Sequence, residues 1–180
     1  MAPLAQERRW LLASFTGCLR PNILLHYATA HNMAGEVTLF TKIINGDIPC
    51  CEVARGETWL AFLDINPRRE GHTLVVPYEA KQRLADLSSH QMSELFQGVV
   101  EAQLRLSNYF GTTDFSIGIH DGPIAGQEVP HVHIHVVPRT KGDGGLSLLA
   151  CWPNAPPPGS VEPDFSKLNK LAAALRNMGE

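Results

Sequence analysis

Residues 131–137 read His-Val-His-Ile-His-Val-Val, a run in which histidine alternates with apolar residues. Because successive side chains of a β-strand point to opposite faces, the three histidines share one face of such a strand. Val132, Ile134 and Val136 share the other face and are expected to pack in the core. The run therefore predicts a strand that is apolar on one side and lined with imidazoles on the other.

The segments around this run predict an α+β fold. Strands are expected where apolar and β-branched residues lie between turn residues, over residues 51–54, 59–64, 72–77, 114–120 and 131–137. Strands and helices do not alternate strictly along the chain, so an antiparallel sheet is favoured over a doubly wound parallel one.

Three helices are expected. Thr38 caps a short helix over residues 39–45. A capping box precedes a long helix over residues 89–110, and Asp164 caps a final amphipathic helix near the C-terminus. The apolar face of the long helix is expected to contain Met92, Leu95, Phe96, Val99 and Val100.

Composition excludes several functional classes. The 180 residues include 15 Lys plus Arg and 18 Asp plus Glu, a formal net charge of −3. We therefore expect no basic surface suited to a nucleic-acid backbone and no nucleic-acid partner. No apolar run reaches the length of a transmembrane helix, so no membrane association is expected.

One domain is expected over residues 37–144, with an extension at each end. The N-terminal extension, residues 1–36, contains three arginines but a single acid before Glu36. Such a stretch is typical of a mitochondrial presequence, but an unstructured extension or initiation at Met33 fits it too. We expect a cytoplasmic protein, with the mitochondrion as the alternative. Residues 145–180 form a C-terminal tail that contains the final helix.

The histidine face allows three interpretations. A purely structural role suits a lone histidine better than a triplet on one strand. A zinc site would use two of the imidazoles as ligands, but no Asp or Glu lies on the same strand face. In nucleophilic catalysis a neutral imidazole attacks an electrophile while its neighbours orient it and transfer protons. Catalysis is the interpretation that the pattern favours.

The segment before the run indicates the electrophile. Residues 120–127 read His-Asp-Gly-Pro-Ile-Ala-Gly-Gln. The two glycines allow backbone N–H groups to turn towards an anion. A phosphate group is therefore the expected target of the nucleophile.

These residues resemble the histidine-triad (HIT) superfamily. The run at 131–137 matches its signature of alternating histidines and apolar residues, and the loop at 121–127 is similar to that of the Fhit-like and Hint-like branches. Three stretches before the run fit the family in order and spacing, namely residues 40–49, 61–67 and 71–77. After the run, residues 138–144 resemble many bacterial-type members. The resemblance covers residues 38–144.

The resemblance implies a HIT-like fold, in which a five-stranded antiparallel sheet is accompanied by one long and one short helix and the protein is a homodimer. It also implies a hydrolase that cleaves the α-phosphate bond of AMP-X, where X is the leaving group, through a covalent nucleotidyl-histidine. The substrate is then a purine nucleotide, and no metal or other cofactor is required. His133 is the implied nucleophile, and His131, His135 and His72 complete the catalytic cluster.

The resemblance also assigns the substrate-binding residues. Those expected near the phosphate and the leaving group are Gln127, Gly126, His120 and Glu128. Asp64 is expected to hold the ribose hydroxyls, as a carboxylate can accept two hydrogen bonds. The apolar wall around the base is expected to comprise Leu39, Phe40, Ile43, Phe62 and Ile65.

Departures from the family pattern bear on the substrate. Relatives often carry Ser or Thr where Glu128 stands, and Asn or Gln where His120 stands. A carboxylate repels a polyphosphate leaving group and attracts a cationic amine, so nucleoside 5′-monophosphoramidates are favoured. The Fhit-like residues 121–123 keep dinucleoside polyphosphates as an alternative. A nucleotide-binding scaffold with little turnover is the rival from another class.

Thr41 stands where some bacterial relatives carry a zinc-binding cysteine.

Overall fold

The computed structural model describes residues 37–146 and 160–178. The expected presequence, residues 1–36, lies outside the described residues. The chain divides after Asp143 into two compact units.

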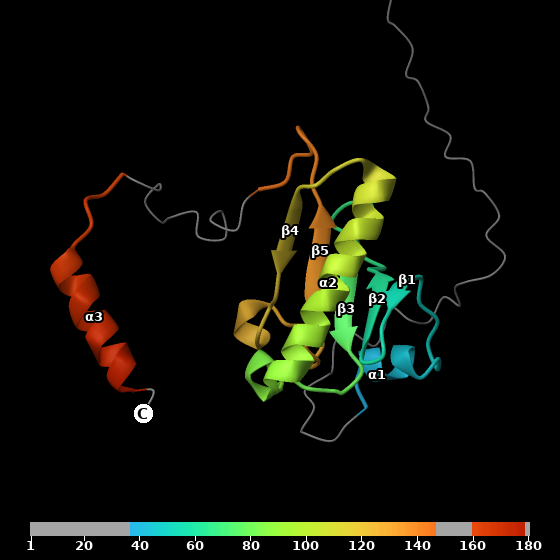
Figure 1. Ribbon diagram of the computed structural model, residues 1–180, viewed down its shortest axis with the longest axis horizontal. Helices are drawn as coiled ribbons and strands as arrows, with labels where there is room; N and C mark the ends of the chain where they lie inside the picture. The colour runs from blue at the N-terminus through green and yellow to red at the C-terminus, as the bar shows by residue number, and fades with distance from the viewer. Residues whose placement is uncertain (1–36, 147–159, 179–180) are drawn as a thin grey trace, which may run out of the picture. The chain divides into compact units, whose positions relative to one another are not determined.

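The first unit is built on one antiparallel sheet of five strands, in the order β1-β2-β3-β5-β4 (Figure 1). The strands are β1 (Glu52–Arg55), β2 (Trp59–Leu63), β3 (Thr73–Pro77), β4 (Phe115–Gly118) and β5 (Ile134–Pro138). β5 therefore lies inside the sheet, and β4 and β1 are its edges. The five-stranded antiparallel sheet and the α+β class are confirmed.

One face of the sheet is covered by α2 (Ser89–Phe110), which crosses it in Figure 1. Ser88 and Gln91 form the expected capping box, and Gly111 ends the helix at φ 65°, a conformation that glycine adopts without a Cβ clash. The core on this face is formed by Ala54, Trp59, Ala61, Val75, Leu87, Leu95, Val99, Ala102, Leu106, Val132, Ile134 and Val136. The three apolar residues of the histidine run thus pack as expected.

The predicted apolar face of α2 is wrong at two positions. Leu95 and Val99 are buried, but Phe96 is 47% exposed and Val100 is 55% exposed. Apolar spacing alone merges two adjacent stripes of this helix, since residues one apart lie 100° apart around it. The second stripe continues to Leu104, which is 56% exposed.

On the other face of the sheet, α1 (Leu39–Ile44) packs Phe40 against residues of β2 and β3, and it begins at the predicted cap, Thr38. The Thr38 side chain accepts a hydrogen bond from the backbone N–H of Thr41. The core on this face contains Phe40, Leu60, Phe62, Leu74, Val76 and Val129. The histidine rings lie on this side of the sheet, where Phe40 packs edge-on against two of them.

Ladder pairing in β5 begins later than predicted. The sequence pattern extends the strand back to His131, whereas the structure starts it at Ile134. Before that point the backbone turns away from the sheet, and the N–H of Val132 donates to the carbonyl of Lys81. Two short 3-10 helices, η2 (Leu84–Asp86) and η3 (Pro123–Ala125), also lie in segments where the sequence predicts no helix.

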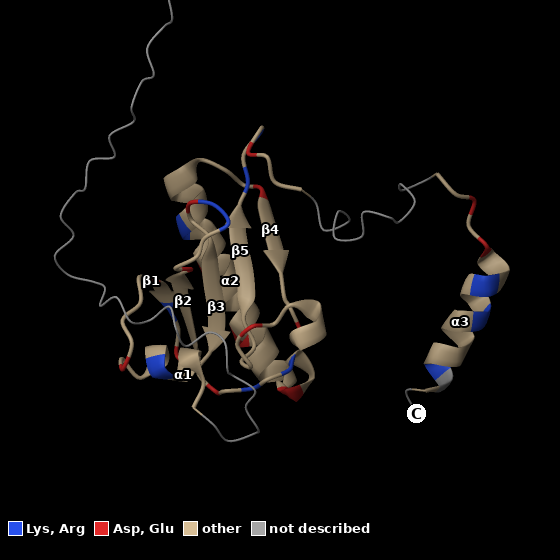
Figure 2. Cartoon of the chain, turned by 180° about the vertical axis from the view of Figure 1, so that it is seen from behind, with Lys and Arg blue, Asp and Glu red and all other residues tan. Residues whose placement is uncertain are grey.

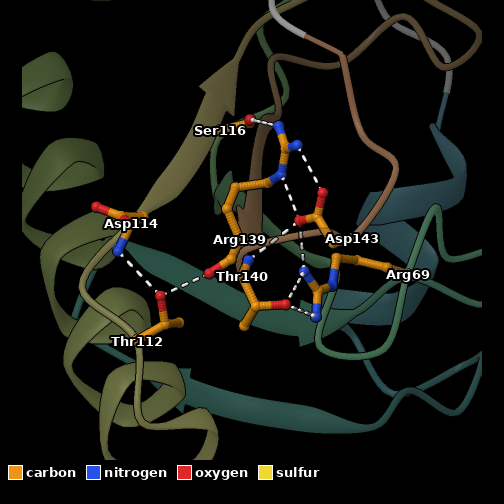
Figure 3. Close-up of polar contacts among 7 residues, drawn as sticks. All are labelled: Arg69, Thr112, Asp114, Ser116, Arg139, Thr140 and Asp143. Atoms are coloured by element: carbon orange, nitrogen blue, oxygen red, sulfur yellow. Dashed lines mark hydrogen bonds and ion pairs between the residues drawn. The ribbon is translucent and has the colours of Figure 1, made fainter.

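An arginine–aspartate cluster ties the loop between β2 and β3 to the end of β5 (Figure 3). Asp143 accepts hydrogen bonds from Arg69 Nη1 at 2.7 Å and from Arg139 Nε and Nη2 at 2.7 and 2.8 Å. Thr140 donates its backbone N–H to the same carboxylate. The loop held in this way contains Asp64 and His72, so the cluster helps to position two of the predicted site residues.

The second unit contains α3 (Phe165–Asn177), which begins at the predicted cap Asp164. Figure 2 shows basic residues along this helix and acidic residues only in the segment before it. Its apolar residues are exposed, among them Leu168, Leu171 and Leu175. Among the described residues, no helix is long and apolar enough to cross a membrane.

Gly98 of α2 should not tolerate a side chain. A Cβ at this position would lie 2.6 Å from the Trp59 ring, and one at Gly56 would also collide with that ring. Trp59 is itself buried in the core, so a side chain at Gly98 would force it to shift. We expect Gly98→Ala to lower the free energy of unfolding by about 1–3 kcal/mol, despite the better helix propensity of alanine.

Urea unfolding followed by circular dichroism measures this effect. Gln97→Ala, at an exposed position of the same helix, is the matched control and should be neutral or slightly stabilising. A Gly98→Ala protein as stable as the wild type would contradict the tight contact with Trp59.

Candidate active site

His133 lies directly before β5 and is nearly buried, with 6% of its surface exposed. Its Nδ1 lies 2.8 Å from the carbonyl oxygen of His131. Because a carbonyl can only accept, Nδ1 carries the proton and donates, which leaves Nε2 as an unprotonated nitrogen. Burial also lowers the pKa of His133, so the ring is neutral near pH 7. His133 therefore has the protonation state that a nucleophile needs.

His131 is completely buried and is hydrogen-bonded at both ring nitrogens. Nε2 lies 2.9 Å from the carbonyl oxygen of Pro77, and Nδ1 lies 2.9 Å from Oγ1 of Thr38. Burial lowers its pKa to about 4. The two hydrogen bonds hold the His131 ring in place, and the backbone carbonyl of the same residue orients His133.

His135 contacts three other imidazoles. Its ring centre lies 5.0 Å from that of His133 and 5.1 Å from those of His72 and His120. Its Nδ1 is 3.0 Å from Nε2 of His72. Burial, together with the charges that His133 and His72 would carry, lowers its pKa to about 4. The predicted cluster of His131, His133, His135 and His72 is thus assembled, with His120 at its exposed rim.

Asp64 extends the cluster behind His72. Its Oδ2 lies 3.4 Å from Nδ1 of His72, and the backbone N–H of Arg68 approaches the same nitrogen at 3.3 Å. The carboxylate suits a protonated Nδ1, whereas the N–H donor suits an unprotonated one. Both tautomers of His72 therefore find a partner, and a proton can be placed at either end of the His72–His135 hydrogen bond.

The glycine loop is organised differently from the sequence expectation. The N–H groups of Ala125, Gly126 and Gln127 already donate to carbonyls within the loop. In this conformation they are not directed at an anion. The positive φ angles at Gly122 and Gly126, 117° and 96°, serve to close η3 instead.

The loop is also held from outside. Arg83 Nη1 donates to the carbonyl of Asp121, and a Cβ at Gly122 would lie 1.9 Å from that same nitrogen. Gln127 is buried and donates its side-chain N–H to the carbonyl of Gln82 at 2.8 Å. The stretch from Lys81 to Arg83, which sequence reasoning did not select, thus supports the loop through backbone carbonyls and one guanidinium.

Two buried polar atoms of this region have no hydrogen-bond partner. They are Nε2 of His135 and Oε1 of Gln127, and no other such side-chain atoms occur in the part of the chain that the structure describes. Buried polar groups are nearly always paired, so an unpaired one needs a physical reason. Both fall among the predicted site residues, which is the arrangement expected where a polar ligand completes the pairing.

The remaining predicted residues lie around the cluster to different extents. Phe40 and Phe62 are buried and pack edge to face at 5.7 Å, and Leu39 and Ile43 are partly buried beside them. Glu128 is exposed, but its charge raises the pKa of His133 slightly against the effect of burial. Ile65 is 62% exposed and is not part of the apolar cluster.

A metal ion has one candidate ligand set among the described residues. Ligand atoms of Asp64, His72 and His135 all lie within 4.8 Å of one another. Nε2 of His72 and Nδ1 of His135 are, however, already joined by a hydrogen bond, so an ion bound at these two nitrogens would have to take its place. Metal binding would replace that bond and displace its proton.

The buried histidines make the stability of the fold depend on pH. The pKa values of His131 and His135 fall from 6.5 to about 4 on folding, so between these values the unfolded chain binds more protons. The contribution of these two rings to the free energy of unfolding is then fully present above pH 6.5 and is lost as the pH falls towards 4. For His131 alone we expect a loss of about 2 kcal/mol between pH 7 and pH 5.

Urea unfolding at a series of pH values between 4.5 and 7.5 measures this loss. His135→Gln should show a shallower dependence because one of the depressed groups is removed. A free energy of unfolding that stays flat or rises as the pH falls from 6.5 to 5 would show that these rings are not held neutral by burial.

The sequence also matches known proteins. The family model described as the HIT domain matches residues 45–142. The adenosine 5′-monophosphoramidase of Saccharomyces cerevisiae is 32% identical over 162 residues, 87% of this chain and 95% of the yeast protein. The asymmetrical bis(5′-nucleosyl)-tetraphosphatase of Schizosaccharomyces pombe is 43% identical over 83 residues, 46% of each chain.

A solved structure agrees with the fold. The crystal structure of a HIT family protein from Bacillus anthracis superposes with a TM-score of 0.66 at 32% identity, covering 78% of this chain and 95% of that one. The five-stranded sheet, the clustered histidines and these matches lead to one assignment. The chain belongs to the HIT family.

Proposed function

We propose that the protein is a nucleotide hydrolase that cleaves the α-phosphate bond of AMP-X substrates, with nucleoside 5′-monophosphoramidates favoured. The observation that carries the proposal is the hydrogen bond between Nδ1 of His133 and the His131 carbonyl oxygen, which places the ring proton at Nδ1 and leaves Nε2 free to attack. A neutral imidazole nitrogen in a buried site is a competent nucleophile for phosphorus.

The reaction proceeds in two displacements. Nε2 of His133 attacks the α-phosphorus, the bond from phosphorus to X breaks, and X leaves with the electron pair and takes up a proton. Water then attacks the nucleotidyl-histidine, the phosphorus–nitrogen bond breaks, and AMP is released with the ring restored. His135 is the group best placed to transfer these protons, as its Nε2 is unpaired and its Nδ1 is linked to His72.

The nucleoside would lie against α1 and β2. Phe40 and Phe62 offer aromatic surfaces for a purine, and the partly buried Leu39 and Ile43 continue that wall. Asp64 accepts one backbone hydrogen bond, from Asn66, at Oδ1. A carboxylate oxygen has a further lone pair, so this side chain retains acceptor capacity for ribose hydroxyls.

The leaving group is the point on which the two related activities differ. The relative named as a phosphoramidase matches 87% of this chain, and the one named as a tetraphosphatase matches 46%. Glu128 adds an exposed negative charge beside the cluster, which disfavours an anionic polyphosphate and favours an amine. Dinucleoside polyphosphates remain the second candidate because of the Fhit-like sequence Asp121-Gly122-Pro123.

Replacing the nucleophile should abolish turnover without abolishing binding. We expect wild-type protein to release AMP from adenosine 5′-monophosphoramidate with a chelator present throughout, and His133→Asn to release at least 10³-fold less. Chromatography of the products measures the rate, and calorimetry with AMP measures the binding that should persist. His90→Asn, which changes an exposed histidine of α2, is the matched control and should keep wild-type activity.

The same assay separates the alternatives. If diadenosine polyphosphates are cleaved faster than the phosphoramidate, the protein is a dinucleoside polyphosphate hydrolase. Glu128→Thr should shift the ratio of the two rates towards the polyphosphate. If the protein binds nucleotide but turns over neither substrate, the proposal of a hydrolase fails and the protein is a nucleotide-binding module. Full activity in His133→Asn would overturn the mechanism.

We also propose that the protein is a homodimer formed through β4 and α2. β4 is an edge of the sheet and its Ile117 is 44% exposed. On α2 the stripe of Phe96, Val100 and Leu104 is apolar and about half exposed, although the helix already buries another face. An edge strand offers unpaired backbone groups and an exposed apolar stripe offers surface to bury, and a second copy can supply a partner for both.

A charge in this stripe should separate the subunits. We expect Val100→Asp to be monomeric at micromolar concentration, because a carboxylate at the centre of an apolar interface loses its hydration. Sedimentation equilibrium compares it with the wild type and with Glu57→Lys, a charge change beside β1 at the opposite edge of the sheet. A monomeric wild type, or a dimeric Val100→Asp, would contradict this interface.

A further inference from the structure

The hydroxyl of Thr38 lies at the end of a buried chain of hydrogen bonds that reaches the nucleophile. Oγ1 of Thr38 is 2.9 Å from Nδ1 of His131, and Nε2 of His131 is 2.9 Å from the Pro77 carbonyl. The backbone carbonyl of His131 then accepts the Nδ1–H of His133 at 2.8 Å. Thr38 and His131 are 93 residues apart in the sequence.

The hydrogen-bond partners of the His131 ring determine which atom donates and which accepts in each of its hydrogen bonds. The Pro77 carbonyl only accepts, so Nε2 of His131 must donate and must carry a proton. If Nδ1 donated as well, the ring would be a buried cation with 0% exposure and no carboxylate among its contacts. Nδ1 therefore accepts, and the Thr38 hydroxyl donates to it.

Thr41 keeps the Thr38 hydroxyl in this role. Oγ1 of Thr38 accepts from the backbone N–H of Thr41 at 3.0 Å and lies 2.9 Å from the Thr41 hydroxyl. Since the one proton of the Thr38 hydroxyl is directed at His131, the Thr41 hydroxyl must donate to Thr38. Both acceptor positions of Oγ1 are then filled, and its proton has a single destination.

We propose that Thr38 is a positioning residue of the catalytic centre: its hydroxyl donates to Nδ1 of His131, keeps that ring neutral and fixed, and so holds the carbonyl that orients His133. The proposal rests on the proposed function of His133 as the nucleophile. It gives the N-cap residue of α1 a second role beside helix capping, because the same oxygen that caps the helix secures the ring.

The electrostatic consequence explains why neutrality is required. His133 is the titratable group whose charge acts on His131, and both rings pack edge-on against Phe40. A positive charge on His131 would act on the neighbouring imidazole through its electrostatic field and would lower the reactivity of Nε2 of His133. Holding Nδ1 as an acceptor prevents that charge.

Three substitutions separate this role from helix capping. Thr38→Ser keeps both the cap and the donor. Thr38→Val has nearly the same shape and loses both. Thr38→Asp keeps the cap, as aspartate is a good N-cap residue, but it can only accept and so reverses the hydrogen bond to His131.

The first readout is the protonation of His131, observed through the ¹⁵N shifts of its two ring nitrogens in labelled protein at pH 7. The wild type and Thr38→Ser should show a protonated Nε2 and an unprotonated Nδ1. Thr38→Asp should show both nitrogens protonated. A wild-type ring with a protonated Nδ1 would overturn the proposal without any reference to activity.

The second readout is hydrolysis of adenosine 5′-monophosphoramidate. Thr38→Ser should retain kcat within about twofold, whereas Thr38→Val and Thr38→Asp should lose tenfold or more in kcat with KM changed by less than threefold. Circular dichroism and thermal unfolding establish that each variant is folded. The hydroxyl has no positioning role if Thr38→Asp is folded and fully active. The same holds if Thr38→Ser loses as much kcat as Thr38→Val. If the wild type hydrolyses nothing yet the ¹⁵N pattern holds, the hydrogen-bond chain stands and the proposed function fails.

Discussion

Burial of imidazole rings is the constraint on which this structure depends. Desolvation penalises the charged form, so the buried rings of His131, His133 and His135 remain neutral, and a neutral imidazole has one protonated and one unprotonated nitrogen. Each ring must then find a partner for each nitrogen in a region with little water. The Pro77 carbonyl and the Thr38 hydroxyl meet this demand at both nitrogens of His131, and the His131 carbonyl meets it at Nδ1 of His133. The placement of α1 and of the turn before β5 follows from it.

The alternation of the histidine run carries most of what the sequence could predict. A period of two residues assigns each side chain to a face, and the structure confirms that Val132, Ile134 and Val136 pack beneath α2 while the histidines lie on the other side. Capping signals at Thr38 and Ser88 likewise located two helix starts. These features are local, so they can be read from neighbouring residues.

The rest could not be predicted because it depends on contacts between distant segments. The support of Gln127 by the Gln82 carbonyl and the hydrogen bond between Thr38 and His131 involve backbone atoms or common residue types with no sequence signal. The apolar pattern of α2 does not say which stripe meets the sheet, so it cannot distinguish the exposed stripe of Phe96 and Val100 from the core-facing one. The glycine loop directs its N–H groups inward for a similar reason, since glycine permits several conformations and the flanking Arg83 decides among them.

The carboxylate of Asp143 also decides where the first unit ends. It lies between Arg69 and Arg139 and accepts hydrogen bonds from both (Figure 3), although it comes after the last strand and after the pattern that defines the sheet. A chain shortened a few residues earlier would keep every strand and every histidine, yet it would leave two guanidinium groups facing each other without their shared anion. The functional boundary of the domain is therefore set by charge balance at residue 143 rather than by the end of regular secondary structure.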